Sequence, residues 1–186
     1  MIDSINILLF RVIYDGATSH PLLAMLGIFL ATMLPYFLIA ILLYYEGIVR
    51  RFANGRVLLL RLFVAPAAAL ALATMMKHLI EMPRPYAALS DVVALAPYTD
   101  ALATFPSMHT MVFAALGMLF YRNDHAMGKW FLLGGALIGL GRIMVGVHWP
   151  IDVFAGYAAG CAVGYVTDHL ERFVDRTRMF ASLRKR

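Results

Sequence analysis

Three short stretches of this apolar chain carry ionisable side chains that packing alone does not explain. They are residues 77–85, 106–109 and 141–152. An ionisable residue at membrane depth is costly, and it therefore indicates a functional site. Together the stretches supply cations, two histidines and a carboxylate. This set is suited to binding a phosphate and transferring it.

Lys77, Arg84 and Arg142 are the candidate phosphate ligands. The guanidinium fork of arginine matches two phosphate oxygens, and the lysine ammonium adds a mobile point charge. Pro83 and Pro85 flank Arg84, so the backbone that presents its side chain is stiff. The alternative is that these cations only contact lipid headgroups, and that alternative is strongest for Lys77.

Ser107 and His109 follow Pro106 at the predicted start of a membrane helix. The unpaired backbone N–H groups of a helix N-terminus attract anions, and the Ser107 hydroxyl adds a donor. His109 is suited to protonating a leaving oxygen near neutral pH. The plainer alternative is that Ser107 only caps the helix and that His109 is a polar residue of the membrane interface.

His148 and Asp152 are four residues apart across a helix start at Pro150. In the first turn, Asp152 can accept a hydrogen bond from one imidazole nitrogen and orient His148 as a nucleophile. The alternative is that Asp152 only caps the helix and His148 lines the interface. A metal site that also includes His78 and His109 is not predicted, because three nearby cations would repel a divalent ion.

Membrane helices are the elements that must position these residues. The 186 residues are 62% hydrophobic and 15% charged, with a mean hydropathy of +0.76, whereas a soluble domain has about 25% charged residues. The apolar runs predict an all-α, polytopic membrane helical bundle of about five transmembrane helices. A short N-terminal amphipathic helix precedes them and ends at Asp15 and Gly16. The predicted spans are 21–45, 57–80, 106–121, 130–147 and 150–167, with kinks at Pro35 and Pro66.

The chain is interpreted as one membrane-embedded domain, 1–186, whose motif-bearing core is about 57–167. Residues 86–105 are predicted to form an extramembrane loop with one short helix, and this loop is our candidate for covering the pocket. The single cysteine, Cys161, lies in an apolar run and is interpreted as a packing residue. The first 14 residues lack the pattern of a removed signal peptide.

The placement of basic residues predicts the topology. Twelve of the sixteen Lys and Arg residues fall on the side of the membrane that holds the C-terminus, so the C-terminus is predicted to be cytoplasmic and the three motifs extracytoplasmic. The net charge is +5, but the charged residues flank the predicted spans and form no continuous stripe, so no nucleic-acid partner is predicted. Gly156, Gly160 and Gly164 share one face of the last span, which predicts close helix packing within the chain, with an oligomer seam as the alternative.

The three motifs read Lys77-x6-Arg84-Pro85, Pro106-Ser107-Met108-His109 and Gly141-Arg142-x5-His148-x3-Asp152. In order and spacing they resemble the three-part signature of the type-2 phosphatidic acid phosphatase superfamily. Those membrane lipid phosphatases share a catalytic core with vanadium haloperoxidases and bacterial acid phosphatases. The resemblance covers about residues 57–167.

The resemblance implies a role for each motif residue and no cofactor or metal. His148 attacks phosphorus and forms a phosphohistidine, Asp152 orients it, and His109 protonates the leaving group. The phosphoryl oxygens are bound by four side chains: Lys77, Arg84, Ser107 and Arg142. The sequence departs from the family pattern at two positions, where Met108 replaces a usual glycine and Gly141 a frequent serine. Met108 is expected either to crowd the phosphate or to shape the groove for the lipid tail.

Within the superfamily, the chain is most similar to bacterial undecaprenyl pyrophosphate phosphatases of the bacitracin-resistance type. This implies hydrolysis of undecaprenyl pyrophosphate to undecaprenyl phosphate for cell wall biogenesis, at the outer face of the cytoplasmic membrane. The expected partners are therefore a polyprenyl or phospholipid phosphate and the membrane lipid. Phosphatidylglycerophosphate, phosphatidate and lipid A phosphatases would use the same residues. A non-catalytic protein that binds or transports polyprenyl phosphates is the alternative outside enzymes.

Overall fold

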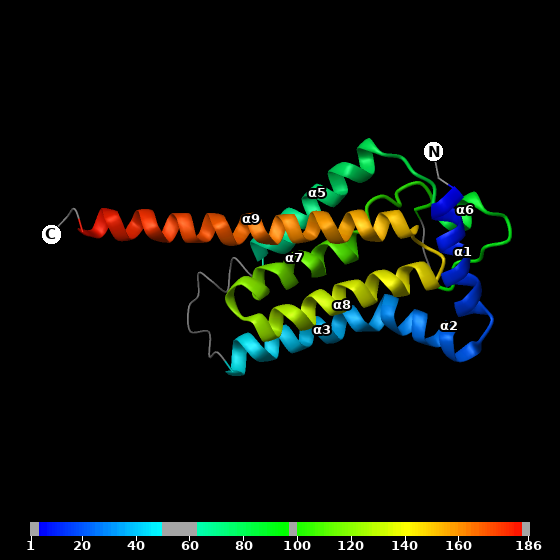
Figure 1. Ribbon diagram of the computed structural model, residues 1–186, viewed down its shortest axis with the longest axis horizontal. Helices are drawn as coiled ribbons and strands as arrows, with labels where there is room; N and C mark the ends of the chain where they lie inside the picture. The colour runs from blue at the N-terminus through cyan, green and yellow to red at the C-terminus, as the bar shows by residue number, and fades with distance from the viewer. Residues whose placement is uncertain (1–3, 50–62, 97–99, 184–186) are drawn as a thin grey trace.

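The computed structural model describes residues 4–49, 63–96 and 100–183, which form helices and connecting loops (Figure 1). Its one isolated β-bridge in these ranges joins Met82 to Ala103. The all-α prediction is therefore confirmed for the part of the chain that is described.

The first apolar span is an almost continuous helix with a change of pitch. It consists of α2 (Pro21–Ile28), the π-helical turn η1 (Phe29–Met33), α3 (Leu34–Tyr44) and a second π-helical turn, η2 (Tyr45–Val49). Pro21 begins it as predicted. The predicted kink at Pro35 corresponds to η1, since the N–H that proline lacks would disturb the regular ladder there.

One helical stretch among the described residues, Pro21–Gly47, is long and apolar enough to cross a membrane by length and composition. The count of five spans therefore stays a prediction. The start of the predicted second span, 57–62, lies outside the described residues.

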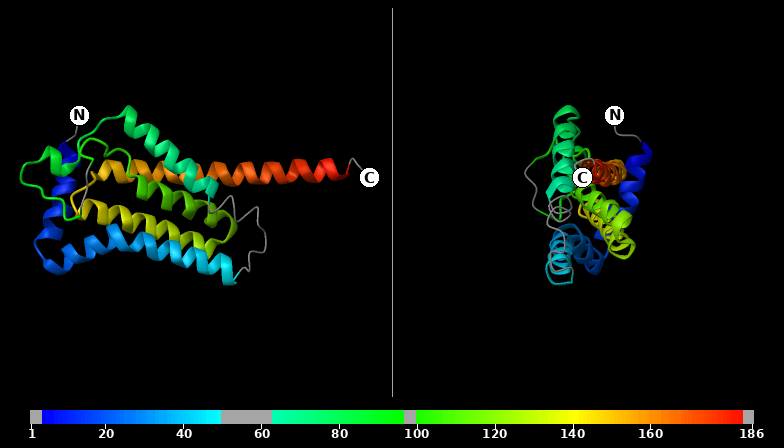
Figure 2. Two further views of the ribbon diagram at one scale, coloured as in Figure 1. Left: turned by 180° about the vertical axis from the view of Figure 1, so that it is seen from behind. Right: turned by 90° about the vertical axis from the view of Figure 1, so that its left-hand side faces the viewer.

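Four further helices form the bundle that carries the motifs. They are α5 (Ala65–Leu79), α7 (Met108–Asn123), α8 (His125–Met144) and α9 (Pro150–Leu183). Helix α7 is central and packs against the other three, while α3 covers α8 (Figure 2). Phe113, Phe120 and Phe131 fill the core between α7 and α8. Helix α9 continues well past the predicted end of its span at Thr167 and projects beyond the bundle (Figure 1).

The glycines of α9 lie against the backbone of α7. A Cβ added at Gly156 would be 2.6 Å from the carbonyl oxygen of Ser107, closer than any side chain tolerates. Gly160 and Gly164 meet the carbonyls of Met111 and Ala115 in the same way. Close packing within the chain, the first of the two interpretations, therefore accounts for this face.

Helix α1 (Ser4–Thr18) crosses the end of the bundle that bears the motifs (Figure 1). Its inner face buries Phe10 against the ring of Trp149, at 5.2 Å between centroids, and its outer face exposes apolar side chains, among them Ile5 and Val12. The predicted end at Asp15 and Gly16 is wrong, because one glycine costs a helix only about 1 kcal/mol and does not stop it.

The loop after α5 contains one short helix, α6 (Pro85–Ala88), as predicted. Two contacts hold its later part on the bundle. The backbone N–H of Leu95 donates to the Val145 carbonyl at 3.0 Å, and the Tyr14 hydroxyl donates to the Val93 carbonyl at 2.9 Å. The loop therefore lies over the turn between α8 and α9.

Candidate active site

His148 lies in the turn that joins α8 to α9. Gly146 adopts a φ of +79° there, which only glycine adopts readily. The imidazole is 2% exposed, and its Nδ1 is 3.3 Å from Asp152 Oδ2. The same oxygen accepts from the backbone N–H of Trp149 at 2.8 Å. Asp152 thus both caps α9 and contacts the histidine, so the two interpretations of this carboxylate are compatible.

The other ring nitrogen of His148 faces Arg84. Arg84 Nη1 is 3.5 Å from His148 Nε2 and donates to the Val147 carbonyl at 2.8 Å. Its Nε donates to the carbonyl of Asp100 at 2.5 Å and its Nη2 to that of Ala103 at 3.0 Å. Backbone carbonyls from two separate segments therefore hold the guanidinium against the candidate nucleophile.

Lys77, in the last turn of α5, reaches the same carbonyl group. Its Nζ donates to the carbonyl of Ala103, and at 3.3 Å to that of Thr104. Lys77 and Arg84 thus share an acceptor, which places two of the predicted phosphate ligands side by side.

His109 and Arg142 meet across the bundle. Arg142 Nη2 is 3.3 Å from His109 Nδ1, and Nη1 donates to the Ala31 carbonyl at 3.4 Å. A guanidinium only donates, so His109 Nδ1 accepts here. Arg142 is 3% exposed and lies within α8, so the alternative of a headgroup contact at the surface does not describe it.

Ser107 immediately precedes α7, and its hydroxyl forms a hydrogen bond with the side chain of Thr110. Ser107 Oγ is 2.9 Å from Thr110 Oγ1, and it caps no backbone N–H of α7. The backbone N–H of Ser107 donates to the Asp152 carbonyl at 3.0 Å. This contact fixes the second motif directly against the third.

Gly141, the second departure from the family pattern, has a packing reason. A Cβ at this position would lie 2.6 Å from Leu30 Cβ and 2.7 Å from the backbone nitrogen of Ala31. The serine frequent in the family would therefore push η1 away. Glycine lets η1 approach α8 closely enough for the Ala31 carbonyl to accept from Arg142.

Thr104 was not singled out from the sequence. It is fully buried, and its hydroxyl contacts both His148 and Asp152. Its position two residues before Pro106 was the available signal, but a single threonine in a loop carries no periodic pattern. Asn6 was missed for the same reason. Its side-chain oxygen accepts from the Ile151 N–H at 3.0 Å, in the first turn of α9.

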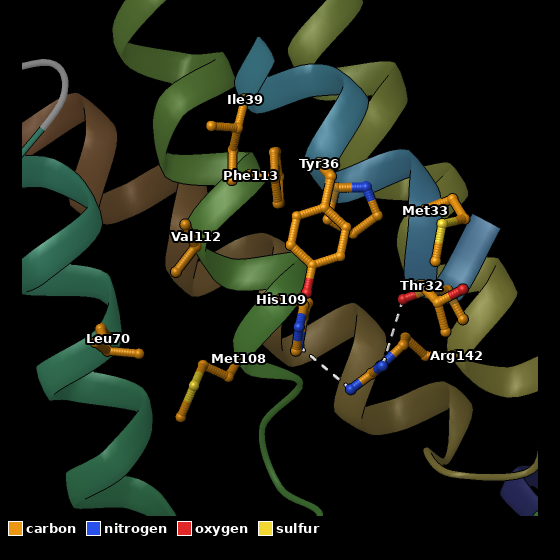
Figure 3. A pocket seen from close by; sticks show the side chains of 12 residues that line it. Thr32, Met33, Tyr36, Ile39, Leu70, Met108, His109, Val112, Phe113 and Arg142 are labelled. Atoms are coloured by element: carbon orange, nitrogen blue, oxygen red, sulfur yellow. Dashed lines mark hydrogen bonds between the residues drawn. The ribbon is translucent and has the colours of Figure 1, made fainter. Parts of the chain in front are cut away.

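An apolar cavity of about 430 Å³ opens beside His109 and Arg142 (Figure 3). These two residues form its polar end. Its remaining lining includes Met108, and it comes from η1, α3, α5 and α7: Ala31, Thr32, Met33, Pro35, Tyr36, Ile39, Leu70, Met108, Val112 and Phe113. Loop 86–105 touches the cationic residues but contributes nothing to this described lining. The prediction that the loop covers the pocket therefore applies to the part of the site around Arg84 and not to the apolar cavity.

Burial and the surrounding cations favour the neutral form of the His148 imidazole. Burial, and after it the positive charges of Arg142 and Arg84, hold the pKa of His148 well below its ordinary value. A neutral ring is the form that has a free lone pair for attack. The geometry is therefore suited to nucleophilic transfer of an anionic group bound among the cations.

The chain is similar to known proteins in sequence and in fold. The family model described as the PAP2 superfamily matches residues 58–174. The Bacitracin transport permease protein BcrC of Bacillus licheniformis is 31% identical over 158 residues, which are 85% of this chain and 76% of that protein. The Undecaprenyl-diphosphatase BcrC of Bacillus subtilis (strain 168) is 34% identical over 101 residues, 54% of this chain and 50% of that one. The crystal structure of Aquifex aeolicus LpxE superposes with a TM-score of 0.72 at 28% identity, covering 89% of this chain and 95% of that one.

Proposed function

The chain belongs to the PAP2 superfamily of phosphatases, and from that premise we propose that it hydrolyses undecaprenyl pyrophosphate to undecaprenyl phosphate and inorganic phosphate. The reaction takes place without a metal, through a phosphohistidine on His148. The carrying observation is the meeting of His109 and Arg142 at the polar end of an apolar cavity. A phosphate bound there has its lipid tail beside it.

In the first step, His148 Nε2 attacks the terminal phosphorus, and the bond from phosphorus to the bridging oxygen breaks. The electron pair leaves with undecaprenyl phosphate, and His109 donates a proton to that oxygen. Because His109 Nδ1 accepts from Arg142 in this structure, His109 can act as an acid only after Arg142 has exchanged this contact for a phosphate oxygen and the ring has taken up a proton from water. Water then attacks the phosphohistidine and gives a proton to His109. The N–P bond breaks, its electron pair returns to Nε2, and inorganic phosphate and neutral His148 are formed.

The cations supply the electrostatic stabilisation. Lys77 and Arg84 bind the oxygens of the transferred phosphoryl group beside His148, and the Ser107 hydroxyl adds a donor at the start of α7. Arg142 binds from the side of the cavity. The charge that builds up on the equatorial oxygens in the transition state is thus surrounded by fixed donors, as in other phosphoryl transfers.

The membrane arrangement is part of the proposal. Five spans, the cytoplasmic C-terminus and a site on the extracytoplasmic side of a bacterial cytoplasmic membrane follow from the apolar runs and the basic flanks. The apolar cavity supports this arrangement, because a lipid phosphate reaches it from the membrane plane without leaving the bilayer.

Purified full-length protein in detergent, with EDTA present, tests the proposal through release of phosphate from undecaprenyl pyrophosphate. His148→Ala should abolish turnover, while His169→Ala, an exposed histidine of α9, should retain it. Full activity of His148→Ala would show that the nucleophile is another group. Binding of undecaprenyl pyrophosphate without turnover by the wild type would favour a binding or transport protein.

A substrate panel separates the lipid phosphatases that share these residues. Undecaprenyl pyrophosphate, phosphatidylglycerophosphate, phosphatidate and lipid A are compared by kcat/KM under one detergent condition. We expect the polyprenyl pyrophosphate to be highest. A higher value for any of the other three reassigns the substrate and leaves the mechanism in place.

A further inference from the structure

Thr104 stands between the candidate nucleophile and its carboxylate. Its side chain is completely buried. Thr104 Oγ1 is 3.1 Å from His148 Nδ1 and 2.5 Å from Asp152 Oδ2. The direct distance from His148 Nδ1 to Asp152 Oδ2 is longer, at 3.3 Å. The hydroxyl therefore offers a second and closer route between the two residues.

The direction of both hydrogen bonds follows from the number of protons. A threonine hydroxyl has one proton, and an ionised carboxylate only accepts, so the Thr104 proton goes to Asp152 Oδ2. The hydroxyl oxygen must then accept from His148 Nδ1–H. The opposite side of the ring agrees, because Arg84 Nη1 faces His148 Nε2 at 3.5 Å and a guanidinium cannot accept. Nδ1 carries the proton and Nε2 carries the lone pair.

We propose that Thr104 is a positioning residue for the reaction, which fixes the Nδ1–H tautomer of His148 and connects it to Asp152 as the ring gains positive charge. The inference rests on the proposed function, since it takes His148 as the nucleophile. When Nε2 bonds to phosphorus, the ring becomes cationic and its Nδ1–H becomes a stronger donor. Thr104 then transmits the carboxylate's stabilisation through two hydrogen bonds in series.

The backbone of Thr104 places the hydroxyl where this role needs it. Its N–H donates to the Met82 carbonyl at 3.2 Å, and its carbonyl accepts from Lys77 Nζ at 3.3 Å. Thr104 is thus anchored to the first motif by its main chain and to the third motif by its side chain. These main-chain bonds remain when only the side chain is changed, so the hydroxyl can be tested separately.

Thr104→Val removes the hydroxyl at nearly constant shape, and Thr104→Ser keeps it. We expect Thr104→Val to lower kcat for phosphate release by about tenfold to a hundredfold, with KM changed less than about twofold. Thr104→Ser should stay within about threefold of wild type. Thr167→Val is the matched control, because this buried threonine of α9 bonds only the Val163 carbonyl of its own helix among the described contacts.

A double-mutant comparison separates positioning from a merely structural effect. If Thr104 acts through Asp152, Thr104→Val should cost little more in an Asp152→Asn background, since residues that act as a unit are not additive. A full additional loss there, unchanged kcat in Thr104→Val, or an equal loss in Thr104→Ser would overturn the inference. Should the valine variant not fold, as judged by thermal unfolding, Thr104→Ala takes its place. An inactive wild type would instead refute the proposed function.

Discussion

The indole Nε1 of Trp149 donates to the carbonyl oxygen of Pro83 at 2.8 Å. This one bond joins the residue next to the candidate nucleophile to the residue next to Arg84. Both ends are backbone neighbours of site residues, so the bond joins the first and third motifs in addition to the contacts of Arg84 with Val147 and His148.

Trp149→Phe tests this connection, because phenylalanine keeps an aromatic ring at this buried position and loses the donor, together with part of the indole volume. We expect a loss of about 1–3 kcal/mol in stability, since the Pro83 carbonyl loses its donor, and a fall of about fivefold or more in kcat. Thermal unfolding and phosphate release in detergent measure the two effects. Trp130→Phe, at a tryptophan that is 66% exposed, is the control, and equal losses in both variants would contradict the prediction.

Asn6→Ala removes the acceptor that α1 provides to the first turn of α9. Loss of a helix cap costs about 0.5–2 kcal/mol, so the melting temperature should fall. Asn6→Asp keeps an oxygen acceptor, and its charge suits a helix N-terminus, so it should retain the wild-type value. If alanine and aspartate behave alike, the side-chain oxygen of Asn6 does not stabilise α9.

Met108→Ala tests the first departure from the family pattern. Met108 lines the cavity beside His109. Its removal should weaken the binding of a substrate with a short lipid tail more than that of a substrate with a long tail, because the long tail keeps its contacts with the rest of the cavity. The ratio of kcat/KM for undecaprenyl over farnesyl pyrophosphate should therefore rise by about tenfold. Met75→Ala, on an exposed part of α5, should leave the ratio unchanged. An equal fall for both substrates would assign Met108 to the phosphate and not to the tail.

Arg84→Gln should shift the acidic limb of the kcat/KM profile to higher pH. The Arg84 charge is one cause, after burial and Arg142, of the low pKa of His148. Removing it raises that pKa, so the ring becomes protonated, and loses its nucleophilic lone pair, at a higher pH. Both enzymes are measured with one substrate, so the substrate's own ionisation cancels. Arg11→Gln, on α1, should leave the limb in place, and a limb that stays or moves to lower pH in Arg84→Gln would contradict the assignment.

Part of the arrangement of the site residues follows from the sequence. His148 and Asp152 are separated by one helical turn across Pro150, and this local spacing is enough to predict their contact. The assignment of His109 and Arg142 to one site followed from the predicted spans, which place the second and third motifs on the same side of the membrane. Local spacing and the order of apolar spans are properties that a single sequence expresses.

Contacts made by single polar residues could not be predicted in this way. Thr104 and His148 are 44 positions apart, and Asn6 and Ile151 are 145 apart. Neither Thr104 nor Asn6 belongs to a periodic pattern or carries a charge. Their partners are determined only when the loop before α7 and helix α1 fold onto the bundle.

Helix ends were the other part that the sequence placed poorly. Helix α1 runs through Gly16, and α9 continues past Thr167. At Gly16 nothing lies within 4 Å of the position of a Cβ, so no tertiary contact opposes another turn. The boundary of a membrane span is set by hydropathy, but that of a helix is set by backbone hydrogen bonds, and the two need not coincide.

The glycine face of α9 has a consequence for how this scaffold can change. Gly156, Gly160 and Gly164 contact backbone carbonyls that are also four residues apart, at the start of α7 and along it. Because both sets repeat once per turn, this packing fixes the register of the two helices. The hydrogen bond from the Ser107 N–H to the Asp152 carbonyl lies at one end of this helix contact. The helices that carry the second and third motifs are thus held at one position, whereas η1 and α3 line the facing side of the apolar cavity with exchangeable side chains. New lipid preferences should arise by substitutions on that side, with the chemistry left untouched.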